Sequence, residues 1–278
     1  MVSQQDLADL ERWSSESSMV LHPKKCKVLH FHFTKGANAK FRSFCESFPL
    51  VGTAYQRVKM KIAVLGATGQ TGQYLVNQAV QQGHTVTAIV RTPGKLTVSH
   101  ENLKVVEGNI FSEDSLKPHI KDHDAVISCL GFPASFIYGV TGYSLSMNAV
   151  INAMRQVKVN RIITMTSWYT DPNSGTKSSY LIRFLLLPMI RSVLSDMYEM
   201  EAFLKKTEDI NWTVVRPPGL RNEPATGKEF LTHESYFVPD SSGNPERSSV
   251  ARGDVARFML SLLDNNAWFK KAVAITTK

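Results

Sequence analysis

The sequence predicts an α/β protein: a doubly wound parallel sheet with helices on both faces, preceded by a poorly structured N-terminal extension. From Met60 onward, short β-branched runs alternate with amphipathic stretches of helical period, a pattern typical of βαβ units. A glycine-rich turn joins the first of these runs to the first helical stretch. Residues 1–59 show no such alternation. We therefore divide the chain into an N-terminal extension, residues 1–59, which is not part of the α/β fold, and a domain, residues 60–278.

Composition excludes several classes of protein. The chain has 278 residues, 43% hydrophobic and 20% charged, which allows a packed core and excludes global disorder. The three cysteines, Cys26, Cys45 and Cys129, form no CxxC or Cys/His pattern. We therefore expect no disulfide scaffold and no metal site. The net charge of +8 divides equally between the two parts, and a surplus of this size does not indicate nucleic-acid binding.

No segment is expected to enter a membrane. The longest apolar stretch, 181–190, contains Arg183 and Pro188 and is too short to span a bilayer. No charged-then-apolar leader opens the chain, so we expect a cytoplasmic protein. A monomer is the favoured state.

The N-terminal part carries one resemblance. The residues LERWSSESSMVLHPKKCKVLHF (10–31) resemble a segment near the end of the polymerase domain of non-LTR retrotransposon reverse transcriptases, and the resemblance covers about residues 6–33. It is too short to hold a catalytic aspartate pair, so it implies no polymerase activity. We interpret it as a transposon-derived fusion or a gene-model artefact. The alternatives are a purposeful extension and an RNA-binding appendage that uses Lys24, Lys25 and Lys27.

The glycine-rich turn predicts a dinucleotide site in a Rossmann-like sheet. The buried run KIAVL (61–65) leads into GATGQTG (66–72) and a helix that ends at Gly83. Gly66 permits the tight turn, Gly69 lets the backbone approach a pyrophosphate, and Gly72 lets helix and strand pack closely. The helix N-terminus then offers free N–H groups to the phosphates. The alternative is that the glycines only allow a tight turn between strand and helix and that no ligand binds there.

The end of the second predicted strand indicates which cofactor binds. NAD sites place an Asp or Glu there for the ribose hydroxyls, whereas this chain places Arg91, followed by Lys95. Two cations attract a 2′-phosphate. We therefore predict that the cofactor is NADP(H). The alternative is that Arg91 is only a solvated charge at the end of a strand.

Further strands are predicted at 103–107, 125–129, 161–166 and 212–216. Parallel sheets bind ligands at the carboxyl ends of their strands. There, Asn109 and Ile110 are expected beside the adenine, and Leu130 and Gly131 beside the nicotinamide ribose. The alternative is that Gly131 serves only the geometry of the turn that follows the strand. Arg252-Gly-Asp254 precedes a predicted helix at 255–263, with Asp254 as its N-cap, a structural role.

Together these motifs resemble the atypical short-chain dehydrogenases/reductases of the NAD(P)H-binding, NmrA-like group, and within it the flavin reductase/biliverdin reductase B branch. The resemblance covers essentially all of residues 60–278 and is carried by KIAVLGATGQTG (61–72), TVTAIVR (85–91), DAVISCLG (124–131), TMTS (164–167) and RPP (216–218). It implies an NADP(H) site formed by Gly66, Ala67, Thr68, Gly69, Gln70, Thr71, Gly72, Arg91, Lys95, Asn109, Ile110, Leu130, Gly131, Thr166, Pro217 and Pro218.

For catalysis, the resemblance places Ser167 at the active-site serine and Tyr198 where relatives carry a pocket histidine. Gly219 replaces a second histidine of the group. We expect the Tyr-x-x-x-Lys pair of conventional relatives to be absent, because the residues four positions after Tyr143, Tyr169, Tyr180 and Tyr198 are Met147, Asn173, Phe184 and Ala202. The alternative to a catalytic role is that Ser167 only caps the segment that follows it.

Two functions remain open at this point. The first is an NADPH-dependent reductase that transfers hydride to a flavin-like, tetrapyrrole-like or quinone-like small-molecule acceptor, which needs little proton assistance. Apolar residues between 168 and 187 would wall the acceptor site, or pack on the core, or form a self-association face. The second is a non-catalytic, NmrA-like redox sensor that acts through a protein partner.

Overall fold

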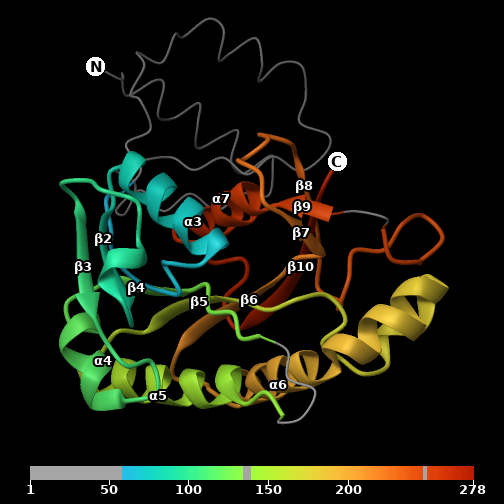
Figure 1. Cartoon of the computed structure of the whole chain (residues 1–278), viewed down its shortest axis with the longest axis horizontal. Coiled ribbons are helices and arrows are strands. Elements are labelled where there is room, and N and C mark those ends of the chain that lie inside the picture. The colour runs from blue at the N-terminus through green and yellow to red at the C-terminus, as the bar shows by residue number, and fades with distance from the viewer. Residues whose placement is uncertain (1–57, 134–138, 247–248) are drawn as a thin grey trace, which may run out of the picture. The chain divides into compact units, whose positions relative to one another are not determined.

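The computed structural model describes residues 58–133, 139–246 and 249–278 (Figure 1). Its centre is an eight-stranded sheet of order β3-β2-β1-β4-β5-β6-β10-β8. Neighbouring strands are parallel except β10 and β8, which are antiparallel. The strands are β1 (Lys61–Leu65), β2 (Thr85–Val90), β3 (Leu103–Glu107), β4 (Ala125–Ser128), β5 (Arg161–Met165), β6 (Asn211–Arg216), β8 (Phe230–His233) and β10 (Lys271–Thr277). The predicted doubly wound parallel sheet is confirmed.

Helices cover both faces of the sheet (Figure 1). One face carries α3 (Gln70–Gln81) and α7 (Arg252–Ser261), and the other carries α4 (Glu113–Ile120), α5 (Gly142–Val157) and α6 (Leu187–Lys205). A short parallel pair, β7 (Gly219–Arg221) and β9 (Ser249–Ala251), stands apart from the main sheet. Single helical turns lie at η1 (Pro93–Lys95), η2 (Ser174–Lys177) and η3 (Ile182–Leu186), the last a π-turn that continues directly into α6.

The central strand β1 shows why the sheet is buried on both faces. Ile62 and Val64 pack into the core beneath α3 and α7, whereas Ala63 and Leu65 pack into the core beneath α4, α5 and α6. Successive side chains of a strand point to opposite faces, so an unbroken apolar run supplies both cores. β1 also pairs with β2 on one side and β4 on the other. The strand order reverses direction at this point, which is where sheets of this kind bind ligands.

One local prediction was wrong. Asp254 does not cap the helix, because α7 begins at Arg252 and its N-cap is Ala251. Asp254 instead lies in the first turn, where its carboxylate accepts hydrogen bonds from the backbone N–H and hydroxyl of Thr226 and from Arg257. The role is structural, as expected, but the carboxylate ties a distant loop to the helix. The reverse-transcriptase resemblance of residues 6–33 lies outside the described residues.

Candidate functional site

The glycine-rich loop lies between β1 and α3, against the end of β4. Gly66 has a φ of +72°, and a Cβ at this position would lie 2.6 Å from the carbonyl carbon of Cys129. A Cβ at Gly72 would lie 2.2 Å from the carbonyl oxygen of Gly66. Neither position accepts a side chain. The α3 N-cap, Gly69, makes no side-chain cap, which leaves the first N–H groups of the helix available to an anion.

A cavity of about 500 Å³ opens beside this loop, at the carboxyl ends of β1, β2, β4 and β5. Nine of the predicted cofactor-binding residues line it: Gly66, Thr68, Gly69, Gln70, Thr71, Arg91, Ile110, Leu130 and Gly131. The structure therefore brings together residues that are spread over 66 positions of sequence.

The other predicted cofactor residues lie outside this lining. Ala67 and Gly72 are buried behind the loop, and Pro217 is buried after β6. Lys95 is exposed on the η1 turn that follows Arg91. The Asn109 side chain is also exposed, and its Oδ1 accepts a hydrogen bond from the Phe111 N–H at 3.0 Å.

The charge of this cavity is positive. Arg91 lines it at the end of β2 and Arg252 lines it from the start of α7, and no carboxylate is among its lining residues. The Arg252 guanidinium donates from Nη1 to the Thr71 hydroxyl at 3.1 Å. Its buried Nε has no hydrogen-bond partner within the described residues, and burial lowers the pKa of the Arg252 guanidinium below its usual value. This is the chemistry of an anion site, and it fits the phosphates of a dinucleotide.

Sequence reasoning missed Arg252 as a site residue. The packing of α3 against α7 places it beside the glycine loop; for example, the Gln78 side chain of α3 donates to the Gly253 carbonyl at 2.8 Å. The only signal in the sequence was an arginine at the start of a predicted helix.

A second, larger cavity of about 1110 Å³ lies next to the end of β5. Ser167 and Pro218 line it, together with apolar residues of η3 and α6 such as Ile182 and Ile190. Met165, two residues before Ser167, lines the smaller cavity. The end of β5 therefore separates the two cavities.

Tyr169 also lines the larger cavity, although it was not among the predicted catalytic residues. Its φ of +64° is unusual for a side chain of this size, and its N–H donates to the Tyr236 carbonyl at 3.1 Å. Burial raises the pKa of Tyr169 to about 12. The phenol is therefore protonated at neutral pH, as an ordinary tyrosine is, and Tyr169 contributes to the lining of the cavity.

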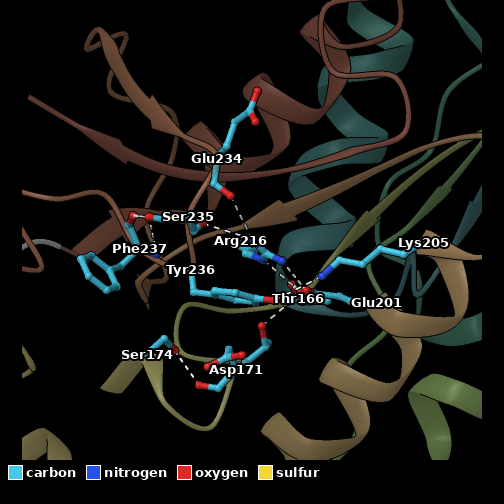
Figure 2. Close-up of polar contacts among 11 residues, drawn as sticks. Thr166, Asp171, Ser174, Glu201, Lys205, Arg216, Glu234, Ser235, Tyr236 and Phe237 are labelled. Carbon is cyan, nitrogen blue, oxygen red and sulfur yellow. Dashed lines mark hydrogen bonds and ion pairs between the residues drawn. The ribbon is translucent and has the colours of Figure 1, made fainter. Parts of the chain in front are cut away.

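A buried ion pair supports the segments on both sides of this cavity (Figure 2). The side chains of Glu201 on α6 and Arg216 on β6 are each 2% exposed, and Arg216 Nη2 and Nε both donate to the carboxylate. Thr166 and Thr170 donate their hydroxyls to Glu201 Oε1 at 2.9 and 3.2 Å. Thr166 thus holds the strand end in place, and its side chain does not line either cavity.

The guanidinium of Arg216 also lies over the ring of Tyr236, 4.0 Å from its centroid, as Figure 2 shows. Arg216 Nη1 donates to the carbonyls of Glu234 and Ser235. The half-buried ring of Tyr198 packs near the Tyr236 ring, with 6.4 Å between centroids, and lines neither cavity. The structure therefore does not bring Tyr198 together with Ser167 in the larger cavity.

Comparison with known proteins agrees with this geometry. The sequence profile of the NAD(P)H-binding family matches residues 66–266. The chain belongs to this NAD(P)H-binding family. Its cofactor is accordingly a nicotinamide dinucleotide, and the glycine loop with its positive cavity fits that group. The match begins at residue 66 and gives no support to the reverse-transcriptase interpretation of residues 6–33.

The chain is 32% identical over 230 residues to an uncharacterized chloroplastic protein of Arabidopsis thaliana, covering 79% of this chain and 80% of that one. Two solved structures share the fold. An oxidoreductase of Lactococcus lactis has a TM-score of 0.66 at 17% identity, covering 79% of this chain and 91% of its own. A Streptococcus pneumoniae protein described as an NADH-flavin reductase has a TM-score of 0.60 at 21% identity, covering 79% of this chain and 100% of its own.

Two further expectations concern membranes and the catalytic pair. Within the described ranges, no helix is long and apolar enough to cross a bilayer; the cytoplasmic location stays a prediction. The spacing Tyr-x-x-x-Lys does occur once in the whole chain, at Tyr55 and Lys59. Tyr55 lies outside the described residues and precedes the family match.

Proposed function

We propose that the protein is an NADPH-dependent reductase that delivers hydride to a flat, largely apolar acceptor of the flavin, tetrapyrrole or quinone type. The observation that carries the proposal is the position of the two cavities on either side of the β5 end. A dinucleotide anchored at the glycine loop and extended along the strand ends would place its nicotinamide near this boundary. The larger cavity then offers space for an acceptor.

The residues of the smaller cavity would hold the cofactor. The first N–H groups of α3 and the Arg252 guanidinium meet the diphosphate, while Arg91, with Lys95 on the following turn, meets the 2′-phosphate. Leu130 and Gly131 line the path toward the nicotinamide end. The bound cofactor supplies the hydride, and the protein supplies position and charge.

The residues of the larger cavity would orient the acceptor. Ser167 and Tyr169 are hydroxyl donors on its lining, and Ile182 and Ile190 give it an apolar wall. Ser167 is proposed as the hydrogen-bond donor to the acceptor at the reacting end. Because extended conjugated acceptors spread the incoming charge, they need little proton transfer from the protein.

The choice of NADPH over NADH is tested by titrating both cofactors into the wild-type protein and Arg91→Glu. A charge-assisted hydrogen bond contributes about 1.5–3 kcal/mol, and about 1.4 kcal/mol is a factor of ten in affinity. We expect wild type to prefer NADPH at least tenfold and the variant to lose or invert this preference. Lys121→Glu, an exposed position that lines neither cavity, is the charge-matched control. Equal affinities in the wild type would refute the assignment of NADPH.

The acceptor is tested by steady-state NADPH oxidation with FMN and with a soluble quinone. We expect Ser167→Ala to lower turnover by about 1–3 kcal/mol in activation free energy while NADPH affinity stays within a few-fold. If turnover is unchanged, Ser167 has only the structural role of capping the following segment.

The NmrA-like sensor is the second candidate, and it is favoured by the absence of a Tyr-x-x-x-Lys pair from Met60 onward. A sensor binds NADPH in the titration above and oxidises it with neither acceptor. The two assays together therefore separate the reductase from the sensor.

A further inference from the structure

The segment from Tyr180 to Arg191 carries a concentrated apolar surface. Nine large apolar side chains are exposed within the described ranges, and six of them belong to this segment: Tyr180, Leu181, Phe184, Leu185, Leu186 and Met189. Tyr180 is 83% exposed and Phe184 65% exposed, and their rings stack on each other with centroids 6.0 Å apart. Figure 1 shows this segment in yellow, as a helical end that projects from the body of the domain. An exposed patch of this kind marks an interaction site.

One side of this helical segment lines the larger cavity, and the other side faces outward. Ile182, Leu187 and Ile190 line the larger cavity. Leu181, Leu185 and Met189, spaced four residues apart, do not line it and are exposed by 69, 56 and 49%. We call these three side chains, with Phe184, the outer apolar face; Tyr180, which stacks on Phe184, lines the cavity. The fold of the described domain does not use this face, because its cores are complete without it.

The charged residues of the segment itself are all cations, while Asp240 and Glu246 line the neighbouring larger cavity beside Lys177. Residues 172–195 contain no Asp or Glu but include Lys177, Arg183 and Arg191, all exposed. None of the three forms an ion pair with a described residue. Lys177 and Arg183 donate only to backbone carbonyls, those of Gly243 and Thr176. The cations are therefore free to meet negative charge outside the domain.

We propose that the outer apolar face docks on an anionic membrane surface, with its helix lying in the plane of the interface. Apolar side chains flanked by Lys and Arg are what such surfaces bind: the apolar groups enter the acyl boundary and the cations meet the lipid phosphates. A second copy of the chain fits less well, because a two-fold contact through this face brings like cations together. The segment is far too short to span a bilayer, so the attachment is peripheral.

The test uses the full-length protein in co-sedimentation with vesicles of phosphatidylcholine, alone or mixed with phosphatidylserine. We expect wild type to bind the mixed vesicles at least tenfold more tightly than the neutral ones. The double variant Leu181→Asp/Leu185→Asp should lose at least tenfold of the binding to mixed vesicles. Leu145→Asp is the matched control, because Leu145 on α5 is 56% exposed, the same as Leu185, and its replacement should change nothing.

The charge is tested separately. Arg191→Gln should weaken binding to the mixed vesicles about fivefold, whereas Lys121→Gln should not. NADPH titration of each variant reports that the domain is folded, since none of these residues lines either cavity.

Each other outcome overturns the proposal. Absence of binding to both vesicle types does so directly, and equal binding to neutral and mixed vesicles removes the role of the cations. Concentration-dependent dimers in sedimentation velocity, lost in the double variant and present without vesicle binding, would assign the face to a second copy of the chain.

Discussion

The substitution Glu201→Gln should lower the free energy of unfolding far more than any single surface substitution, because it leaves the Arg216 guanidinium buried without its counter-charge. Both side chains are 2% exposed. Glu201 accepts hydrogen bonds from Thr166, from Thr170 and from two nitrogens of Arg216. Glutamine keeps the shape of the side chain but removes the charge and one of the two acceptor oxygens.

The magnitude follows from this burial. Removing one partner of a buried ion pair costs about 3–5 kcal/mol, and a domain of ordinary stability has about 5–15 kcal/mol in total. The variant is therefore expected to lose about a fifth or more of its free energy of unfolding. The Arg155–Asp209 pair has similar geometry, with nitrogen–oxygen distances of 2.7 and 2.8 Å, but its side chains are 41 and 53% exposed. Asp209→Asn should cost only about 0.2–1 kcal/mol.

The assay is urea unfolding of wild type, Glu201→Gln and Asp209→Asn, followed by tryptophan fluorescence and far-ultraviolet circular dichroism. The midpoint should fall strongly for Glu201→Gln and little for Asp209→Asn, with the same denaturant slope for all three. A loss of less than about 1 kcal/mol for Glu201→Gln would refute the reasoning, because it would mean that water reaches the Arg216 charge.

Three further predictions concern acid, thiol reactivity and the N-terminal part. Burial alone would raise the pKa of Asp254, but the hydrogen bonds from Thr226 and Arg257 hold it below 3.8; the stability lost in Asp254→Asn, about 1–3 kcal/mol at neutral pH, should therefore shrink as the pH falls below about 4. Burial raises the pKa of Cys129 to about 12, so native protein should resist iodoacetamide at this residue by peptide mass spectrometry and react in urea. Deleting residues 1–57 should leave thermal stability and NADPH binding unchanged, because β1 already pairs on both sides.

Each of these predictions has a result that contradicts it. A constant difference between wild type and Asp254→Asn down to acid pH would mean that this carboxylate is not ionised in the native state. Rapid native alkylation of Cys129 would show that the smaller cavity exposes its thiol. Insolubility of the truncated chain would place residues 1–57 within the fold.

The first six strands of the sheet could be predicted from the sequence to within a residue or two. Buried parallel strands are continuous β-branched runs, and β1, β2 and β4 fit this description. β8 is short, antiparallel and only partly buried, so its sequence carries no comparable run. Lys271–Thr277 has strand-like composition but was not among the predicted strands. The pairing of β7 with β9 joins residues that are 30 positions apart, and no local pattern encodes it.

The site divides in the same way. The glycine loop is a local motif, and its geometry follows from residue types at fixed spacing. Arg252 reaches Thr71 across 181 positions of sequence, and Glu201 meets Arg216 through the packing of α6 on β6. These contacts depend on how helices pack on the sheet, which a single sequence does not reveal. The roles assigned to Ser167 and Tyr198 rested on resemblance and stay predictions.

The position of β10 has a consequence for synthesis of the protein on the ribosome. β10 is made about 40 residues after β8, yet it lies between β6 and β8 in the sheet. A nascent chain that has not yet reached Lys271 therefore presents β6 as an open edge, and β8 has no strand to pair with. Open edges recruit other chains, and domains that fold during translation do so from the N-terminal side. The glycine loop and strands β1 to β5 are complete in the chain early, whereas β6 and β8 must wait for β10, which exposes these edges to other chains during this interval.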